Sequence, residues 1–278
     1  MTDRYVVAGN PVEHSLSPLI HAAFARQTGQ DIHYDRLLCP LDGFAATLRA
    51  FAASPAARGC NVTVPFKFEA CALAARLSDR ARLAGAVNTL RFDAEGWFGD
   101  NTDGVGLRRD IEANAGFQVP GRSVLLLGAG GAAAGVLGPL LDARPARLVI
   151  AKRTLPHAQR LGGRMDDHAA AAALRASTPD QAGSGFDLVI NATASSLQGE
   201  AVAVPGDWFA PGALAIDMMY GRKARAFLDP AERQGAGTRD GLGMLVEQAA
   251  ESFFVWRGVR PDTVPVLAAL RERATAQA

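Results

Sequence analysis

A glycine-rich turn in the middle of the chain has the residue types and spacing that bind a dinucleotide. Residues 128–133 read Gly-Ala-Gly-Gly-Ala-Ala, which fits the pattern G-x-G-x-x-G/A. They follow the apolar run 123–127 and precede a helix-forming segment, which is the strand–turn–helix context that this pattern requires. Gly128 would allow the tight turn, and Gly130 would let the backbone approach a pyrophosphate held at the helix N-terminus. A purely structural turn is the alternative, and the context favours dinucleotide binding.

The strand expected next ends in basic residues. Residues 148–150 are Leu-Val-Ile, and they run into Lys152, Arg153 and Thr154. A site for NAD usually carries Asp or Glu at this point, about 20 residues after the glycines, to bind the ribose 2′-hydroxyl. No acid is present, and the planar guanidinium of Arg153 suits a 2′-phosphate. Two solvated charges at a strand end are the alternative, but after the glycine turn NADP is favoured over NAD.

Polar residues that could bind a hydroxylated, anionic small molecule gather at turns in the first hundred residues. Ser15 and Ser17 precede an expected helix and could hold an anion, although simple N-capping by Ser17 is favoured on spacing alone. Lys67 lies near an expected helix start, where the helix dipole disfavours a cation. An exposed lysine is an equally good interpretation. Asp103 in a loop and Gln248 on a late helix are ambiguous in the same way.

Alternating strands and helices must position these residues. Period and turn residues predict strands at 5–8, 60–64, 85–92, 123–127, 147–150, 186–190 and 213–218. They predict helices at 18–27, 41–53, 67–77, 132–141, 243–256 and 264–276, with a further helical stretch in the alanine run 169–173. Such alternation indicates an α/β fold with a parallel, doubly wound sheet. We expect a nucleotide-binding domain at 105–238 and a second domain made of 1–104 with 239–278.

Composition excludes several other classes of protein. The 278 residues include 29 lysines and arginines against 28 acidic residues, a net charge of +1, which argues against a nucleic-acid partner. No apolar run approaches the roughly 18 residues of a membrane span, and no signal peptide is evident. The three cysteines form no C-x-x-C motif and the five histidines no H-E-x-x-H motif, so neither disulfides nor a metal site is indicated. A cytoplasmic protein fits best.

Taken together, the polar and glycine-rich segments resemble the shikimate dehydrogenase family. The similar segments follow the family's order over residues 9 to 250: GNPVEHSLSP, NVTVPFK, AGAVNT, DNTDG, GAGGAAAG, INAT, DMMYG and DGLGMLVEQA. The resemblance implies an N-terminal α/β domain for substrate and a Rossmann-type domain for NADP, with the active site in the cleft between them. It also implies reversible NADPH-dependent reduction of 3-dehydroshikimate to shikimate in aromatic biosynthesis.

The family's residue roles carry over to matching positions. Ser15 and Ser17 resemble the serines that hold the substrate carboxylate, and Lys67 matches the catalytic lysine, with Asp103 beside it. The other matches to substrate positions are Thr63, Asn88, Asp103, Tyr220 and Gln248. The expected cofactor residues are Asp79, Gly128, Ala129, Gly130, Gly131, Ala132, Lys152, Arg153, Thr154, Met218 and Gly241.

Some positions depart from the family pattern, and some alternatives stay open. Lys152 stands where the family often has asparagine, and no arginine or lysine appears at the three positions after Thr154. A quinate/shikimate or aminoshikimate dehydrogenase of the same fold is one alternative. A non-catalytic ligand sensor is another, although it would be expected to lose Lys67 or Asp103. The sequence is compatible with a monomer or a homodimer.

Overall fold

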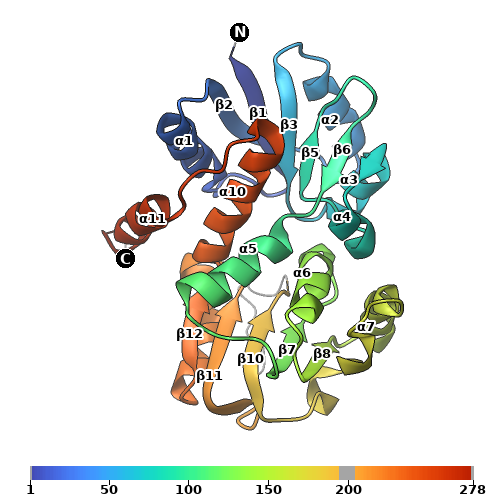
Figure 1. Ribbon diagram of the computed structural model, residues 1–278, viewed down its shortest axis with the longest axis vertical. Helices are drawn as coiled ribbons and strands as arrows, with labels where there is room; N and C mark the ends of the chain where they lie inside the picture. Colours follow the sequence, from blue (N-terminus) through green and yellow to red (C-terminus); the bar gives the residue numbers. More distant parts are fainter. Residues whose placement is uncertain (1, 194–203, 277–278) are drawn as a thin grey trace. The chain divides into compact units, whose positions relative to one another are not determined.

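The chain forms two compact α/β units in the computed structural model, which describes residues 2–193 and 204–276 (Figure 1). The first unit comprises Met1–Gly106 and Leu245–Ala278, and the second comprises Leu107–Met244. The chain passes between the units inside two helices, α5 (Asp103–Arg109) and α10 (Leu242–Arg257). Residues 239–244, which were expected in the first domain, therefore belong to the second unit.

The first unit is built on a mixed six-stranded sheet in the order β2-β1-β3-β5-β6-β4. The strands β2, β1 and β3 are parallel, β5 is antiparallel to both β3 and β6, and β4 is parallel to β6. Their bounds are β1 Asp3–Gly9, β2 Ile32–Leu38, β3 Ala57–Val62, β4 Arg76–Leu77, β5 Thr89–Arg91 and β6 Phe98–Asp100.

Alternate residues of β1 belong to two different hydrophobic clusters. Val6 and Ala8 pack with Phe44 and Leu48 of a helix on one side of the sheet. Tyr5 and Val7 share a cluster on the other side with Tyr34 and Trp256. Because successive side chains of a strand point to opposite faces, this alternation shows that both faces of β1 are covered. The continuous apolar run 5–8 reflects that double burial.

The helices of the first unit, besides α5 and α10, are α1 Ser17–Thr28, α2 Phe44–Ala52, α3 Lys67–Leu73, α4 Asp79–Ala84 and α11 Val264–Ala276. Ser17 is the first residue of α1 and not its N-cap, which is Leu16, so the capping interpretation is wrong. The helix expected at 67–77 ends at Leu73, because Arg76–Leu77 pairs with β6. Ser78 then caps a separate short helix by accepting the amide of Ala81 at 3.2 Å.

A hydrogen bond joins the end of α10 to the sheet of the first unit, although the two are far apart in the sequence. The indole Nε1 of Trp256 donates to the carbonyl of Leu90, at 2.9 Å. A Cβ on Gly59 would lie 2.4 Å from that carbonyl and 2.8 Å from the indole nitrogen. Only glycine leaves room for this close approach. The contact places the end of α10 against strands made from the first hundred residues.

The second unit has an all-parallel sheet in the order β12-β11-β10-β7-β8-β9. Its strands are β7 Ser123–Leu127, β8 Arg147–Ala151, β9 Leu174–Ser177, β10 Phe186–Asn191, β11 Phe209–Asp217 and β12 Gly237–Asp240. The chain builds outward from β7 to β9, returns to β10 beside β7, and builds outward again. This is the doubly wound dinucleotide-binding order, and its switch point lies between β7 and β10. The predicted fold class is confirmed.

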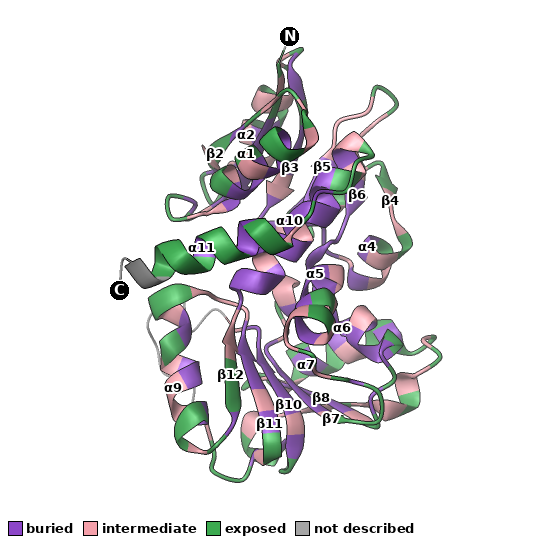
Figure 2. Cartoon of the chain, turned by 60° about the vertical axis from the view of Figure 1, so that its left-hand side comes forward, coloured by how far each residue is buried: buried purple, intermediate pink, exposed green. Residues whose placement is uncertain are grey.

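The central strands of this sheet are buried on both faces, and they are coloured as buried in Figure 2. The helices are α6 Gly131–Asp142, α7 Leu155–Gly162 and α9 Arg225–Arg233, with a π-helical turn at Asp110–Asn114 and 3-10 turns at Gly163–Met165, Ala171–Ala173, Pro179–Gln181 and Gly221–Ala224. The alanine run forms only one 3-10 turn, so the helix expected at 169–173 is wrong. The covering helix after β8 is α7, whose amphipathic pattern was missed. No helix in the described ranges has the length and apolar character to cross a membrane.

Candidate active site

A buried ion pair lies at the centre of the polar residues of the first unit. Lys67 is the first residue of α3 and Asp103 the first residue of α5. The Lys67 Nζ lies 2.5 Å from Asp103 Oδ2, and only 13% and 2% of the two side chains are exposed. The dipole at the start of α3 disfavours a cation, and the Asp103 carboxylate compensates for it. The structure thus brings together two residues that the sequence left ambiguous.

The side chain of Asn88 holds the other carboxylate oxygen. Its Nδ2 donates to Asp103 Oδ1 at 2.9 Å and to Gln248 Oε1 at 2.7 Å. Its Oδ1 accepts the backbone N–H of Thr102 at 2.8 Å. A backbone amide can only donate, so this contact fixes which end of the Asn88 amide is oxygen. Lys67, Asp103, Asn88 and Gln248 therefore form one chain of directed hydrogen bonds.

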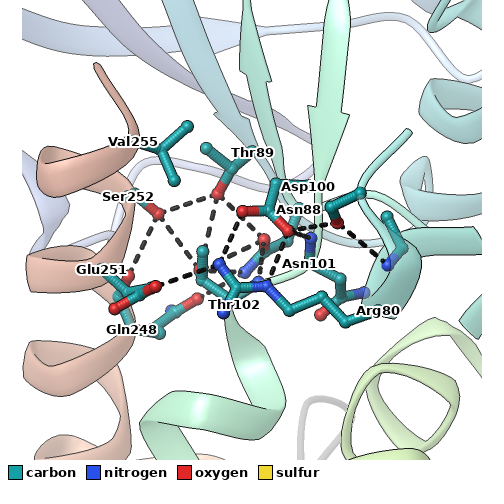
Figure 3. A network of polar contacts seen from close by, with 12 residues as sticks. Arg80, Asn88, Thr89, Asp100, Asn101, Thr102, Gln248, Glu251, Ser252 and Val255 are labelled. Atoms are coloured by element: carbon teal, nitrogen blue, oxygen red, sulfur yellow. Dashed lines mark hydrogen bonds and ion pairs between the residues drawn. The ribbon is translucent and has the colours of Figure 1, made fainter. Parts of the chain in front are cut away.

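A layer of buried hydroxyls, to which the sequence assigned no role of its own, supports this chain (Figure 3). It consists of Thr89 on β5, Thr102 in the loop before α5 and Ser252 on α10, all fully buried. The Nδ2 of Asn61 on β3 donates into the layer, to Ser252 Oγ at 2.9 Å and Thr89 Oγ1 at 3.1 Å. The available sequence signal was Asn61, a polar residue between the buried residues Cys60 and Val62 of β3.

A second ion pair stabilises the segment that leads from β6 into α5, whose first residue is Asp103. Arg80 contacts both carboxylate oxygens of Asp100, at 2.7 and 2.6 Å, and also reaches Glu251 Oε1 at 3.1 Å. Asp100 Oδ1 accepts the Ser78 hydroxyl and the Asn101 backbone N–H as well. Burial opposes ionisation of Asp100, but the hydrogen bonds and charge of Arg80 outweigh it and hold the pKa of Asp100 below its ordinary value.

The predicted carboxylate-binding serines lie at the start of α1. The Ser15 hydroxyl lies 3.2 Å from the Ser17 hydroxyl and accepts the Ser17 backbone N–H at 3.2 Å. Arg36 on the edge strand β2 donates to the Ser15 carbonyl at 2.6 Å. Arg36 thus places a guanidinium beside two hydroxyl donors, and such an arrangement favours an anion. Thr63 follows β3, and its backbone N–H pairs with Ala8 at the end of β1.

In the second unit, the glycine turn has the geometry that a pyrophosphate needs. Gly128 has φ +109°, and a Cβ there would lie 2.9 Å from the Ala192 carbonyl at the end of β10. Gly130 is the N-cap of α6, which begins at Gly131, and its side-chain position faces open space. Free backbone N–H groups at such a helix start bind phosphate groups. The turn Gly128–Ala132 therefore fits a dinucleotide.

The basic residues at the end of β8 are available for a 2′-phosphate. Lys152 keeps its backbone in the sheet by donating to the Ser177 carbonyl at 3.1 Å, while Arg153 and Thr154 are exposed. Among the described residues no ion pair involves the side chain of Lys152 or Arg153. No acid follows the strand, which suits a phosphate and not a free 2′-hydroxyl.

Buried polar contacts shape the ends of β10 and β11. Asn191 Nδ2 donates to Asp217 Oδ2 at 2.8 Å, and Asp217 Oδ1 accepts the Met219 backbone N–H at 2.8 Å. The Gly241 amide donates to the Met219 carbonyl, and a Cβ on Gly241 would lie 2.3 Å from the Met218 carbonyl. Met218 and Gly241, both expected on the cofactor side, are therefore neighbours.

Two further predicted residues are Asp79 and Tyr220. Asp79 begins α4 in the first unit, with its side chain almost fully exposed and paired with Arg82 at 2.6 Å. Tyr220 belongs to the second unit, just before the 3-10 turn Gly221–Ala224. Their predicted contacts with cofactor and substrate stay predictions.

Comparison with known proteins identifies the family of this chain. Family models match residues 7–90 as the shikimate dehydrogenase substrate binding domain, 112–199 as shikimate/quinate 5-dehydrogenase and 241–271 as the shikimate 5′-dehydrogenase C-terminal domain. The shikimate dehydrogenase (NADP(+)) of Methylibium petroleiphilum is 62% identical, covering 97% of this chain and 94% of its own. The chain belongs to the shikimate dehydrogenase family.

Solved structures agree with that membership. The shikimate 5-dehydrogenase of Thermus thermophilus, determined with NADP(H) and shikimate, has a TM-score of 0.84 at 32% identity and covers 98% of this chain and 100% of its own. An Ael1 enzyme of Pseudomonas putida has a TM-score of 0.86 at 44% identity, covering 97% and 98%. The predicted oxidoreductase of the shikimate dehydrogenase family is thus confirmed.

Proposed function

We propose that this protein catalyses the reversible, NADPH-dependent reduction of 3-dehydroshikimate to shikimate. The observation that carries the proposal is the buried chain Lys67–Asp103–Asn88–Gln248, in which a cation, a carboxylate and two amides converge. A cyclic substrate with several hydroxyls needs such a set of directed donors and acceptors. The relatives named above, with their NADP and shikimate, support the proposal.

NADP would be held by the second unit. The turn Gly128–Ala132 would bind the pyrophosphate through backbone N–H groups at the start of α6. Lys152, Arg153 and Thr154 would bind the 2′-phosphate, and Met218 and Gly241 would line the cofactor side. When bound, the reduced cofactor supplies the hydride that the substrate carbonyl carbon accepts.

Substrate would be held by the first unit. Ser15 and Ser17 would donate to its carboxylate, with Arg36 adding positive charge beside them. Thr63, Asn88, Asp103 and Gln248 would contact its hydroxyls or ring. Tyr220 would approach the carboxylate. Because the Asp103 oxygens already accept from Lys67 and Asn88, this carboxylate is fixed in place before substrate binds.

Lys67 would move the proton. As the carbonyl carbon gains a hydride, its oxygen gains negative charge, which the Lys67 ammonium stabilises by hydrogen bonding. The ammonium then gives one proton to that oxygen, which completes the alcohol, and Lys67 regains a proton from solvent. In the reverse direction the neutral amine accepts the alcohol proton. Asp103 holds the Lys67 Nζ in place during both directions.

An absorbance assay of reduced nicotinamide tests the function. Shikimate and quinate are each supplied with NADP+ and with NAD+, and the Lys67→Ala protein serves as the inactive control. We expect turnover chiefly with shikimate and NADP+. Comparable turnover of quinate, or a preference for NAD+, would instead assign a dual-substrate or NAD-dependent enzyme. Ligand binding without turnover in any combination would assign a sensor.

The second candidate, a quinate-using enzyme, rests on one finding. The model that matches residues 112–199 is described as shikimate/quinate 5-dehydrogenase and spans both activities. Those residues include the basic end of β8, which favours NADP. The quinate arm of the assay decides between the two candidates.

A further inference from the structure

Ser252 is a buried hydroxyl at which several parts of the first unit meet. It lies on α10, one helical turn after Gln248, and is fully buried. Its Oγ lies 2.8 Å from Thr89 Oγ1 and 3.1 Å from Thr102 Oγ1. It donates to the Gln248 carbonyl at 3.0 Å and accepts from Asn61 Nδ2 at 2.9 Å. Figure 3 shows the contacts of Ser252 with Thr89, Thr102 and Gln248, which come from the strand, the loop and the helix.

Each contact of Ser252 leads to a residue of the proposed site. Thr89 donates to Asn88 Oδ1 at 2.9 Å, and the Thr102 hydroxyl contacts the same oxygen at 3.2 Å. Gln248 bonds Ser252 through its backbone and Asn88 through its side chain. A closed ring therefore runs from Asn88 through Gln248 and Ser252 to Thr102 and back to Asn88.

Counting protons shows what the Ser252 oxygen contributes. The Gln248 carbonyl can only accept, so it takes the single Ser252 proton. The Asn88 Oδ1 has two lone pairs, and the Thr102 backbone N–H occupies one of them. The acceptors left for the two threonine hydroxyls are the second lone pair of Asn88 Oδ1, the Ser252 Oγ at 2.8 and 3.1 Å and, at 3.5 Å, the oxygen of the other threonine. Without Ser252, one buried hydroxyl has only that 3.5 Å contact left as an acceptor in the ring.

We propose that Ser252 is a positioning residue for catalysis, which fixes the Asn88 amide and Gln248 together and thereby orients Asp103 and Lys67. This inference rests on the proposed function. Asn88 Nδ2 contacts Asp103 Oδ1, Gln248 Oε1 and the Thr102 hydroxyl, at 2.9, 2.7 and 2.9 Å, so the orientation of this amide sets the place of the Asp103 carboxylate and of the Gln248 side chain. If both threonines compete for Asn88 Oδ1, the amide turns, and both contacts weaken. Small misplacements of such groups lower reaction rates strongly.

Two substitutions separate hydrogen bonding from shape. Ser252→Ala removes the hydroxyl, whereas Ser252→Cys keeps the side-chain shape with a weak donor and acceptor. Thr28→Ala is the matched control, because the Thr28 hydroxyl makes the same bond to a carbonyl four residues earlier, Phe24, at 2.7 Å. Thr28 takes no part in the ring. Thermal unfolding by circular dichroism is recorded for every variant, so that any loss of folded protein is measured.

The kinetic readout is the rate with shikimate and NADP+ at saturating and limiting concentrations of each. We expect Ser252→Ala and Ser252→Cys to lower kcat/KM for shikimate by about tenfold, with a raised KM for shikimate. The KM for NADP+ should stay within about twofold of the wild-type value, because the ring contacts only the substrate side. A purely structural defect lowers the amount of active enzyme and leaves both KM values unchanged. Thr28→Ala should behave like the wild type.

The outcomes distinguish this inference from the proposed function. Wild-type protein without activity on shikimate would refute the function itself. If the wild type is active and both Ser252 variants have the same kcat and KM values as the wild type, the positioning role alone is refuted. Full activity in Ser252→Cys with loss in Ser252→Ala would also refute it, because shape would then suffice. If Ser252→Ala does not fold, the isosteric cysteine variant carries the test by itself.

Discussion

The guanidinium of Arg80 contacts both carboxylate oxygens of Asp100, the last residue of β6, which lies three residues before Asp103 at the start of α5. The Asp100 side chain is almost fully buried, and Arg80 is 27% exposed. The loop continues through Asn101, whose Nδ2 donates to the Ala86 carbonyl and whose Oδ1 accepts the Asp103 backbone N–H. The ion pair therefore holds the start of α5, where the proposed catalytic carboxylate lies.

Breaking the Arg80–Asp100 ion pair should destabilise the protein in a pH-dependent way. We expect Arg80→Met to lower the free energy of unfolding at pH 7 by about 3 kcal/mol, because it leaves the Asp100 carboxylate buried without its cation. The pKa of Asp100 in the folded protein lies below 3.8, the value of an unperturbed Asp in the unfolded chain. The ion pair therefore contributes its full stabilisation to the folded protein above pH 3.8. That contribution is lost as the pH falls through the lower pKa of the folded state. Urea unfolding at pH 7 and below pH 4 measures both effects.

Arg82→Met is the matched control for this prediction. Arg82 pairs with Asp79 on the surface of α4, where both side chains are largely exposed. Such pairs contribute about 0–1 kcal/mol, so the control should unfold like the wild type. Equal destabilisation by both substitutions would contradict a special role of the buried pair.

Lys67 and Asp103 should each be needed for turnover. We expect Lys67→Ala to lower kcat more than ~100-fold with a smaller change in KM, as loss of an acid–base group does. Asp103→Asn should also lower kcat strongly, because the 2.5 Å contact that holds the Lys67 Nζ loses its negative charge. Steady-state kinetics with shikimate and NADP+ measures both. Lys223→Ala is the control and should keep the kcat of the wild type. A kcat of Lys67→Ala within a few-fold of the wild type would reject the role of Lys67.

Arg153 should set the preference for NADP over NAD. We expect Arg153→Gln to raise the KM for NADP+ at least about tenfold, because a charge-assisted contact with the 2′-phosphate is lost. The KM for NAD+, which lacks that phosphate, should hardly change. Arg160→Gln, on the neighbouring helix α7, tests for a general effect of charge. A similar rise in KM for both NADP+ and NAD+ would show that Arg153 does not recognise the 2′-phosphate.

His21 should make the fold sensitive to mild acid. It is fully buried, its ring stacks on Tyr34 at 4.2 Å between centroids, and within the described chain neither ring nitrogen has a hydrogen-bond partner of normal geometry. Burial lowers the pKa of His21 from 6.5 to about 3. Below pH 6.5 the His21 imidazole is protonated in the unfolded chain but stays neutral in the folded protein. The free energy of unfolding therefore falls as the pH drops from 6.5 toward 3.

Urea unfolding between pH 7.5 and pH 5 measures this effect. The His21 contribution amounts to about 2 kcal/mol at pH 5. We expect His21→Phe, which keeps an aromatic ring in the cluster, to lack this part of the pH dependence. An unchanged pH profile in the variant would show that another group titrates.

The second unit could be predicted well from the sequence because its signals are local. The strand Ser123–Leu127 has its predicted bounds, since a strand buried on both faces reads as an unbroken apolar run. The glycine turn was recognisable for the same reason. The helix that begins at Lys67 was extended too far because Arg76 and Leu77 leave it only to pair with β6, a contact that no local pattern shows.

Much of the site could not be predicted, because its contacts join distant segments. Asn61 and Ser252 are 191 residues apart along the chain, and the strand signal around Asn61 says nothing of α10. The Arg36 guanidinium donates to the backbone carbonyl of Ser15, and a contact with a backbone atom leaves no signal in the sequence. The resemblance supplied Lys67, Asn88 and Gln248, but not the hydroxyl layer that holds them.

The split sequence of the first unit bears on how the protein is made. Its sheet comes from the first 106 residues, but Gln248, Ser252 and Trp256 come from the segment that begins at Leu245. During synthesis the second unit, which is continuous, leaves the ribosome complete while the first still lacks α10. The amides of the proposed site, the hydroxyl layer and the cover of one sheet face then assemble together, only after α10 has been synthesised. A nascent chain that stops before α10 would carry a folded nucleotide-binding unit without a complete substrate site.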